Sequence, residues 1–210
     1  MIIRGETPAD YTAVENLVRQ AFYNMYRPGC VEHFLVRALR SHNDFVAALD
    51  LVAEEAGEIV GQVMCTKATL VGEDGTRLSA LTLGPISVAP AQQRKGIGKQ
   101  LIAQAAEKAK ALGYAAIVLI GSPANYVASG FVSCKRWQLA TPDGRYPAAM
   151  LVRPLASDAL VGARWTYYES PAFAIDEAAA EHYDATLPPM EKRWQPSQEE
   201  FYILSQAFLD

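Results

Sequence analysis

The sequence is poor in cysteine, has little excess charge of either sign and contains no long apolar run. Its three cysteines, Cys30, Cys65 and Cys134, are too widely spaced for a disulfide framework or a CxxC metal or redox motif. With 19 Lys and Arg against 23 Asp and Glu, the net charge is −4 and no basic stripe is present, which argues against nucleic-acid binding. No apolar run approaches the ~18 residues that span a bilayer, and the N-terminus lacks the apolar core of a signal peptide. We therefore expect a cytoplasmic protein without membrane or nucleic-acid partners.

The apolar pattern predicts one α/β domain. Of the 210 residues, 50% are hydrophobic, which is enough for a full core without disulfides or a structural metal. A strand is predicted at residues 2–4, followed by a helix that begins after Thr7 and a shorter helix over 31–40. From residue 49 the β-rich segments up to about residue 88, joined by turn residues, predict an antiparallel meander.

A β-α-β unit follows the meander. We predict a strand over 78–88, a helix over 98–112 that ends at Gly113, and a strand over 114–120. The last strand is apolar on both faces, which is typical of a strand that lies parallel to a neighbour and is covered on both sides.

The remainder of the chain differs in character. Two segments around the turn at 142–144 predict a closing hairpin. From Asp176 to Asp210 the sequence predicts two helices separated by prolines, with Ser197 and Glu200 as a capping box for the second. We expect a domain over 1–175 and a C-terminal helical extension over 176–210. The apolar side of its last helix must pack on the domain or on a second subunit, which makes a homodimer possible.

Residues 87–99 contain the strongest functional signal. They form a strand end, a turn and the glycine-containing start of a helix, where free N–H groups and the helix dipole favour a phosphate group. The dinucleotide motif GxGxxG fails because residue 101 is leucine, and the Walker motif fails because Gln100 follows the lysine. What remains is the pattern Gln-x-x-Gly-x-Gly of Gln93, Gly96 and Gly98. A helix start that merely has glycines in its turn is the alternative.

Two strings in the sequence resemble a known family, the GCN5-related N-acetyltransferases (GNAT). LTLGPISVAPAQQRKGIGKQLIAQAAEKAKALGY resembles their acyl-CoA-binding motif, and GSPANYVASGF resembles the segment that carries their frequent catalytic tyrosine. The resemblance covers roughly residues 2–135 and is similar to the bacterial YhbS-type branch. It implies a mixed, mostly antiparallel sheet with flanking helices and a central β-α-β acyl-CoA-binding unit. It also implies an acetyl-CoA-dependent N-acetyltransferase that needs no metal.

The resemblance also implies a set of site residues. The strand backbone from Ile86 to Val88 would pair with the pantetheine arm, and the amides from Gln93 to Lys99 would hold the pyrophosphate. Tyr126 would lie near the CoA sulfur and protonate the leaving thiolate, unless it is only a packed aromatic residue. Asn125 would bond the pantetheine or cap a short helix. The implied CoA-binding residues are Ile86, Val88, Gln93, Arg94, Lys95, Gly96, Ile97, Gly98, Lys99 and Asn125.

The general base is not evident from the sequence. Many relatives place a Glu on the strand that matches 78–88, but this strand contains no acidic residue. The base would be a water held by backbone carbonyls or an acid from elsewhere, such as Glu32, Glu54 or Glu55, although surface positions are the default for these acids.

Other reactive residue types give weaker signals. The histidines, His33, His42 and His182, have no metal-site spacing and are expected at the surface or in packing. Two aromatic groups are expected either in the core or in an acceptor pocket: Tyr23 with Tyr26, and Trp165 with Tyr167 and Tyr168.

The sequence thus predicts direct acetyl transfer from acetyl-CoA to a primary amine of a small molecule or protein. The alternative is a module that binds or senses acyl-CoA without turnover. The acceptor, the acyl length and the base are not defined by the sequence.

Overall fold

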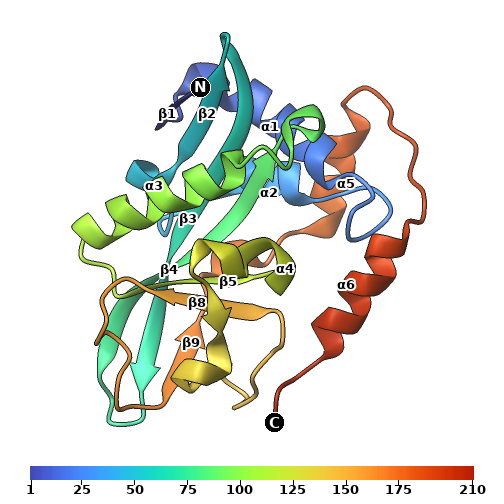
Figure 1. Cartoon of the computed structure of the whole chain (residues 1–210). Helices are drawn as coiled ribbons and strands as arrows, with labels where there is room; N and C mark the ends of the chain where they lie inside the picture. Colours follow the sequence, from blue (N-terminus) through green and yellow to red (C-terminus); the bar gives the residue numbers. More distant parts are fainter.

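The computed structural model describes residues 1–210 and contains one nine-stranded mixed sheet (Figure 1). The main path runs β1-β2-β3-β4-β5-β8-β6, while β9 pairs with β3 and β7 pairs with β9. Only the pairs β4/β5 and β7/β9 are parallel, so the predicted mixed, mostly antiparallel sheet is confirmed. The strands are β1 Ile2–Gly5, β2 Leu51–Glu55, β3 Glu58–Gly72, β4 Arg77–Val88, β5 Ala116–Ile120, β6 Val132–Ser133, β7 Leu139–Ala140, β8 Met150–Pro154 and β9 Trp165–Tyr168.

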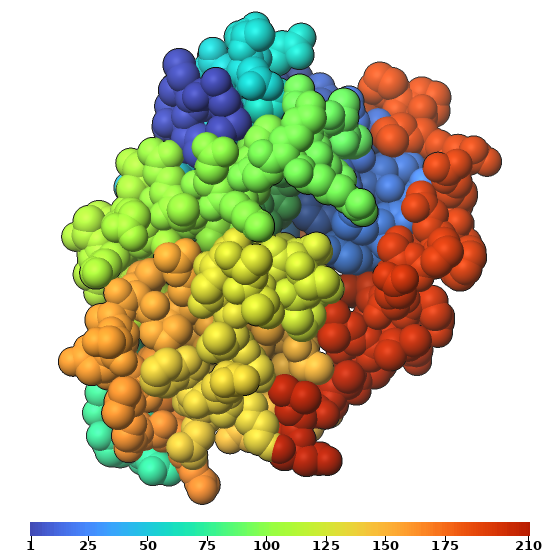
Figure 2. All heavy atoms as spheres, in the orientation of Figure 1, coloured from blue at the N-terminus to red at the C-terminus, as the bar shows by residue number.

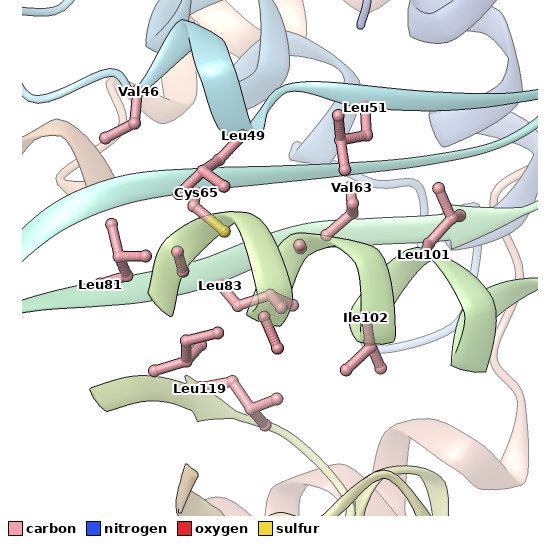
Figure 3. Close-up of a cluster of buried hydrophobic side chains, with 14 of the residues drawn as sticks. Val46, Leu49, Leu51, Val63, Cys65, Leu81, Leu83, Leu101, Ile102 and Leu119 are labelled. Carbon is pink, nitrogen blue, oxygen red and sulfur yellow. The ribbon is translucent and has the colours of Figure 1, made fainter. Parts of the chain in front are cut away.

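Helices cover both faces of this sheet. The α-helices are α1 Tyr11–Phe22, α2 Glu32–Leu39, α3 Ile97–Ala111, α4 Pro123–Tyr126, α5 Glu177–Ala185 and α6 Pro196–Gln206. On one face, the buried side of α3 packs with Leu81, Leu83 and Leu119 of the central strands (Figure 3). On the other face, α1 and α2 bury Val14, Val36 and their apolar neighbours against β2 and β3. None of these helices is long and apolar enough to span a membrane.

The predicted β-α-β unit is present, and its two strands separate beyond a short paired stretch. Strands β4 and β5 are paired at Leu81 with Ile117 and at Thr82 with Val118, and not beyond. Strand β4 also carries one extra residue against β3, since Val63 and Cys65 face Ile86 and Leu83. This bulge lies between Leu83 and Ile86, just beyond the last β4/β5 pair, so β4 diverges from β5 there and leaves a fork between residues 83–88 and the end of β5.

The predicted closing hairpin is wrong. Strand β7 does not pair with β8 across the turn at residues 142–144, but with β9. The segment after that turn is hydrogen-bonded to the C-terminal residues instead: Ala148 N donates to Ala207 O at 2.9 Å, and Leu209 N donates to Tyr146 O at 2.9 Å. Local turn chemistry predicted a turn correctly, but strand partners from distant parts of the chain decided the pairing.

The C-terminal extension lies along the loop between α1 and α2 (Figure 1). The buried Asn24 is bonded by three parts of it: its Oδ1 accepts from Arg193 N at 3.1 Å, its Nδ2 donates to Glu191 O at 2.9 Å, and its carbonyl accepts from Gln198 Nε2 at 3.0 Å. The predicted capping box of α6 is wrong, because Ser197 Oγ donates to Met25 O at 2.8 Å and Gln195 is the N-cap. The extension therefore holds the α1–α2 loop in place.

Deletion of residues 190–210 is expected to lower the melting temperature, because it leaves the buried amide of Asn24 without two partners and uncovers the Tyr26 ring, which lies 4.4 Å from that of Phe201. Each lost buried bond costs about 1–3 kcal/mol. Calorimetry measures the melting temperature, and elution volume reports whether a dimer dissociates. Asn24→Ala should reproduce much of the loss in the full chain. A deletion variant with an unchanged melting temperature and elution volume contradicts this expectation.

A buried carboxyl group makes stability depend on pH. Asp50 is 5% exposed, and burial followed by the neighbouring Glu6 carboxylate raises its pKa well above the usual range. The folded protein therefore binds more protons than the unfolded chain above pH ~4, and stability falls as the pH rises through neutral, by at most about 1.4 kcal/mol per pH unit for one group. Asp50→Asn should remove this dependence, so that its melting temperature exceeds that of wild type by more at pH 8 than at pH 5. A constant difference between those pH values would be evidence against it.

Candidate active site

A cavity of about 620 Å³ opens where the start of α3, the fork of β4 and β5, and α4 meet. Figure 2 shows it as a hollow bounded by green atoms of residues near 90–100, yellow atoms near 125 and blue atoms of the α1–α2 region. Its walls come from four separate parts of the chain, since Met25 of the α1–α2 loop joins the three elements above.

The first wall of the cavity is the N-terminus of α3. Gly96 has a φ of 84° and Arg94 a φ of 62°, so two left-handed residues turn the backbone into the helix. The first helical bond runs from Gln100 N to Gly96 O at 3.1 Å, which leaves the amides of Ile97, Gly98 and Lys99 without an intrahelical acceptor. Together with the cationic side chains of Arg94 and Lys99 in the lining, these amides can hold a pyrophosphate.

The second wall of the cavity is the unpaired edge of β4. Ile86, Ser87 and Val88 line it, and beyond Thr82 this edge of the strand has no pairing with β5. A ligand with amide groups can pair with such an edge as an added strand. The fork is therefore suited to an extended amide-containing arm that runs from the helix terminus towards the centre of the sheet.

The third wall is α4, which begins at Pro123 directly after β5. Tyr126 and Asn125 both face the cavity. The Tyr126 ring packs edge-on against Phe131 with centroids 6.1 Å apart, and a Cβ added at Gly121 would approach its Cε2 to 2.7 Å. Burial, and secondarily the nearby Tyr26 hydroxyl, raises the pKa of Tyr126. Its phenol thus stays protonated at all ordinary pH values.

The structure brings nearly all of the predicted site residues together. The predicted residues on the cavity wall are Ile86, Val88, Gln93, Arg94, Gly96, Ile97, Gly98, Lys99, Asn125 and Tyr126. Lys95 does not line it; its ammonium group donates to Gln92 Oε1 at 2.7 Å. Asn125 does not cap α4, since Ser122 is the N-cap residue.

Five lining residues were missed: Met25, Ser87, Gln92, Ile102 and Ala124. Four of them lie inside or beside the predicted motif and could have been included from strand and helix periodicity. Met25 comes from a loop about sixty residues upstream; its neighbours Tyr23 and Tyr26 were considered for an acceptor pocket, but neither motif nor periodicity connects Met25 itself to the cavity.

The acids considered for a general base lie in different places. Glu54 pairs with Arg4 at 2.8 Å, and Glu55 is exposed at the end of β2, so neither belongs to the cavity. The carboxylate of Glu32 accepts from Val31 N at 3.0 Å at the start of α2, and burial raises its pKa. His33 is fully buried in packing, and no group of three or more His, Cys, Asp or Glu residues is arranged to hold a metal.

Comparison with known proteins agrees with this arrangement. The family model for the acetyltransferase (GNAT) family matches residues 12–134. The uncharacterized N-acetyltransferase YhbS of Escherichia coli strain K12 is 31% identical over 163 residues, which is 77% of this chain and 92% of YhbS.

Solved structures give the same result. The crystal structure of the Escherichia coli GNAT family N-acetyltransferase YhbS in complex with CoA has a TM-score of 0.71 at 28% identity, covering 83% of this chain and 92% of that one. A GNAT family acetyltransferase from Brucella melitensis in complex with acetyl-CoA has a TM-score of 0.65 at 26% identity, covering 82% and 97%. The match of the family model to more than half of the chain and the similarity to YhbS along most of both sequences show that the chain belongs to the GNAT family of acetyltransferases and is of the YhbS type.

Proposed function

We propose that this protein transfers the acetyl group of acetyl-CoA directly to a primary amine of a small molecule or protein, within one ternary complex. The observation that carries the proposal is the cavity that joins the free amides of the α3 terminus, the unpaired edge of β4 and the Tyr126 wall. These three features match the three parts of acetyl-CoA, which are an anionic pyrophosphate, an amide-containing arm and a thioester.

Each wall has a proposed role. The amides from Gln93 to Lys99 hold the pyrophosphate, aided by the side chains of Arg94 and Lys99. The backbone from Ile86 to Val88 pairs with the pantetheine arm and thereby directs the thioester into the fork. Tyr126 donates its proton to the departing thiolate. Lys95 belongs to this set through its backbone amide and not through its side chain, which is bonded to Gln92.

The acceptor enters on the side of the α1–α2 loop. Met25 of that loop lines the same cavity as Tyr126, so an amine that enters beside the loop reaches the thioester, and the C-terminal extension holds this loop. The net charge of −4 favours a cationic acceptor by long-range attraction. Three free, buried cysteines are consistent with a reducing cytoplasm as the working compartment.

The proposal is tested by incubating the protein with acetyl-CoA and a panel of amines while free thiol is followed. The panel contains spermidine, glucosamine, lysine and a peptide with a free N-terminal alanine. We expect at least one amine to release thiol at a rate well above that of acetyl-CoA and protein alone, and mass spectrometry to find the amine heavier by one acetyl group.

Calorimetry on the same sample measures CoA binding independently of turnover. CoA binding without thiol release for any primary amine would favour a module that senses acyl-CoA. Absence of CoA binding would remove the proposal altogether.

A further inference from the structure

Two buried hydroxyl groups meet at the point where β4 and β5 separate. Thr82, the last β4 residue paired with β5, is 3% exposed, and its Oγ1 lies 2.6 Å from the hydroxyl of Tyr167 on β9. Tyr167 is 5% exposed, although it belongs to a short strand at the far end of the sequence. A buried hydrogen-bonded pair of this kind is placed at the root of the fork into which the thioester would be directed.

A carboxyl group completes this pair. The Tyr167 hydroxyl donates to Glu169 Oε1 at 3.4 Å, while Glu169 itself lies beyond the end of β9 and reaches solvent. Tyr167 gives its one hydroxyl proton to the carboxylate, so Thr82 is the donor in the shorter bond. Two hydrogen bonds thus connect Thr82 to Tyr167 and Tyr167 to Glu169. Partial burial of this otherwise solvent-reaching carboxyl raises the pKa of Glu169, in the direction that favours a base near neutral pH.

The Thr82 side chain lies on the face of the sheet opposite α3, because its neighbours Leu81 and Leu83 both pack on the α3 side. The segment after Glu169 packs Ala172, Phe173 and Ile175 against the cluster formed by α1 and α2, the face opposite α3. On the same face, Thr66 is the cross-strand partner of Thr82, is fully buried, and has a hydroxyl without a protein hydrogen-bond partner. Such a group needs a water or ligand partner, so this part of the sheet is suited to a polar molecule.

We propose that Glu169 is the general base that takes a proton from the acceptor amine, directly or through one water, with Tyr167 and Thr82 as residues that position it. This inference rests on the proposed acetyl transfer and supplies the acid that β4 lacks. The sequence alone does not connect these residues, because Tyr167 and Glu169 lie more than eighty residues from Thr82 and only the pairing of β9 with β3 brings them there.

The amine arrives as an ammonium ion, and Glu169 takes one proton from it. The neutral nitrogen then forms a bond to the carbonyl carbon of the thioester while the carbon–sulfur bond breaks. The sulfur takes a proton from Tyr126, and the second proton that the nitrogen loses passes through water to the resulting tyrosinate. One proton in net leaves to solvent from Glu169, which is exposed enough to release it.

The charged groups around Glu169 do not compete for its carboxylate. On the loop before β2, Asp44 accepts from Ser170 Oγ at 2.7 Å and lies 3.7 Å from His42 Nδ1. Lys67 of β3 donates to Asn43 O at 3.0 Å. None of these three side chains is bonded to Glu169, whose hydrogen-bond partner is the neutral Tyr167. Its carboxylate is therefore free to accept a proton from an amine.

The test is the pH profile of kcat/KM with whichever of spermidine, glucosamine, lysine or the alanine peptide is acetylated fastest. In wild type we expect kcat/KM to reach a plateau above the pKa of Glu169, because the carboxylate deprotonates the ammonium ion. In Glu169→Gln the plateau should be lost. The reaction should then be about 10²-fold slower near pH 7 and should keep rising tenfold per pH unit towards the pKa of the amine.

Further variants separate this role from a structural one. In Tyr167→Phe the rise of kcat/KM towards its plateau should occur at higher pH, because the lost hydrogen bond no longer stabilises the ionised carboxylate of Glu169. Tyr168→Phe on the opposite face of β9 and Glu55→Gln should leave the profile unchanged. If Glu169→Gln lowers kcat/KM by the same factor at every pH and keeps the plateau, the proposal is overturned. Loss of the plateau in Glu32→Gln instead also overturns it.

A titration that needs no acceptor separates failure of this inference from failure of the proposed function. Carbon-13 NMR of labelled glutamate carboxyl groups, assigned by comparison with Glu169→Gln, should show Glu169 titrating above the ordinary value of about 4.3 and higher still in Tyr167→Phe. An ordinary value that Tyr167→Phe leaves unchanged would overturn the assignment even if acetyl transfer is established. If no amine is acetylated, the proposed function fails and the base role fails with it.

Discussion

Gly98→Glu is expected to weaken CoA binding by about 10²-fold or more while the protein stays folded. The residue lies in the first turn of α3, where free amides and the helix dipole favour an anion, and it lines the cavity. A glutamate there brings a negative charge against the position proposed for the pyrophosphate and fills the space through which the backbone would approach it. Calorimetry with CoA measures the change in Kd, and thermal melting measures whether the fold is kept.

The neighbouring positions provide the controls. A Cβ at Gly98 meets only Val88 Cγ2 at 3.7 Å, an ordinary contact, so Gly98→Ala should keep the melting temperature and most of the CoA affinity. Gly96 is a less suitable position for this substitution, because its φ of 84° strains the backbone of any residue with a side chain. A loss of CoA affinity there would not be separable from a loss of folding. Ala103→Glu adds the same charge on an exposed part of α3 and should leave Kd unchanged. Unchanged affinity in folded Gly98→Glu would remove the pyrophosphate role of this turn.

The local parts of this molecule were predictable from sequence. Strand 78–88, helix 98–112 and strand 114–120 correspond closely to β4, α3 and β5, because period-two and helical patterns record burial directly. The cluster from Gln93 to Lys99 was predictable for a related reason. Phosphate binding at a helix terminus uses consecutive backbone amides, so its residues are adjacent in sequence as well as in space.

The parts that depend on distant contacts were not predictable. The segment after the turn at 142–144 was predicted to close a hairpin, but Ala207 and Leu209 bond it from the other end of the chain. Met25 reaches the cavity on a loop held by the tail, and the Tyr167 hydroxyl reaches Thr82 through an antiparallel pairing of β9 with the long β3. Periodicity shows which side chains are buried and leaves open which partner buries them.

Tyr126→Phe is expected to lower kcat by about 10²-fold with little change in CoA affinity. The substitution keeps the ring that packs edge-on against Phe131 and removes only the hydroxyl group, and with it the proton. Because burial raises the pKa of Tyr126, the wild-type phenol remains protonated up to at least pH ~10, so the deficit should be the same across the assay range. Steady-state and single-turnover thiol release at several pH values measure the change.

A second variant tests whether position matters as well as the proton. A Cβ at Gly121 would come to 2.7 Å from the Tyr126 ring, and Gly121 has an ordinary φ, so Gly121→Ala should displace the phenol without strain in the backbone. Its kcat should fall between wild type and Tyr126→Phe. A CoA thiol, with a pKa near 8.5, is an acceptable leaving group on its own, which limits how large either loss can be. A less than threefold change in Tyr126→Phe, with acetyl transfer shown to limit turnover, would assign Tyr126 to packing alone.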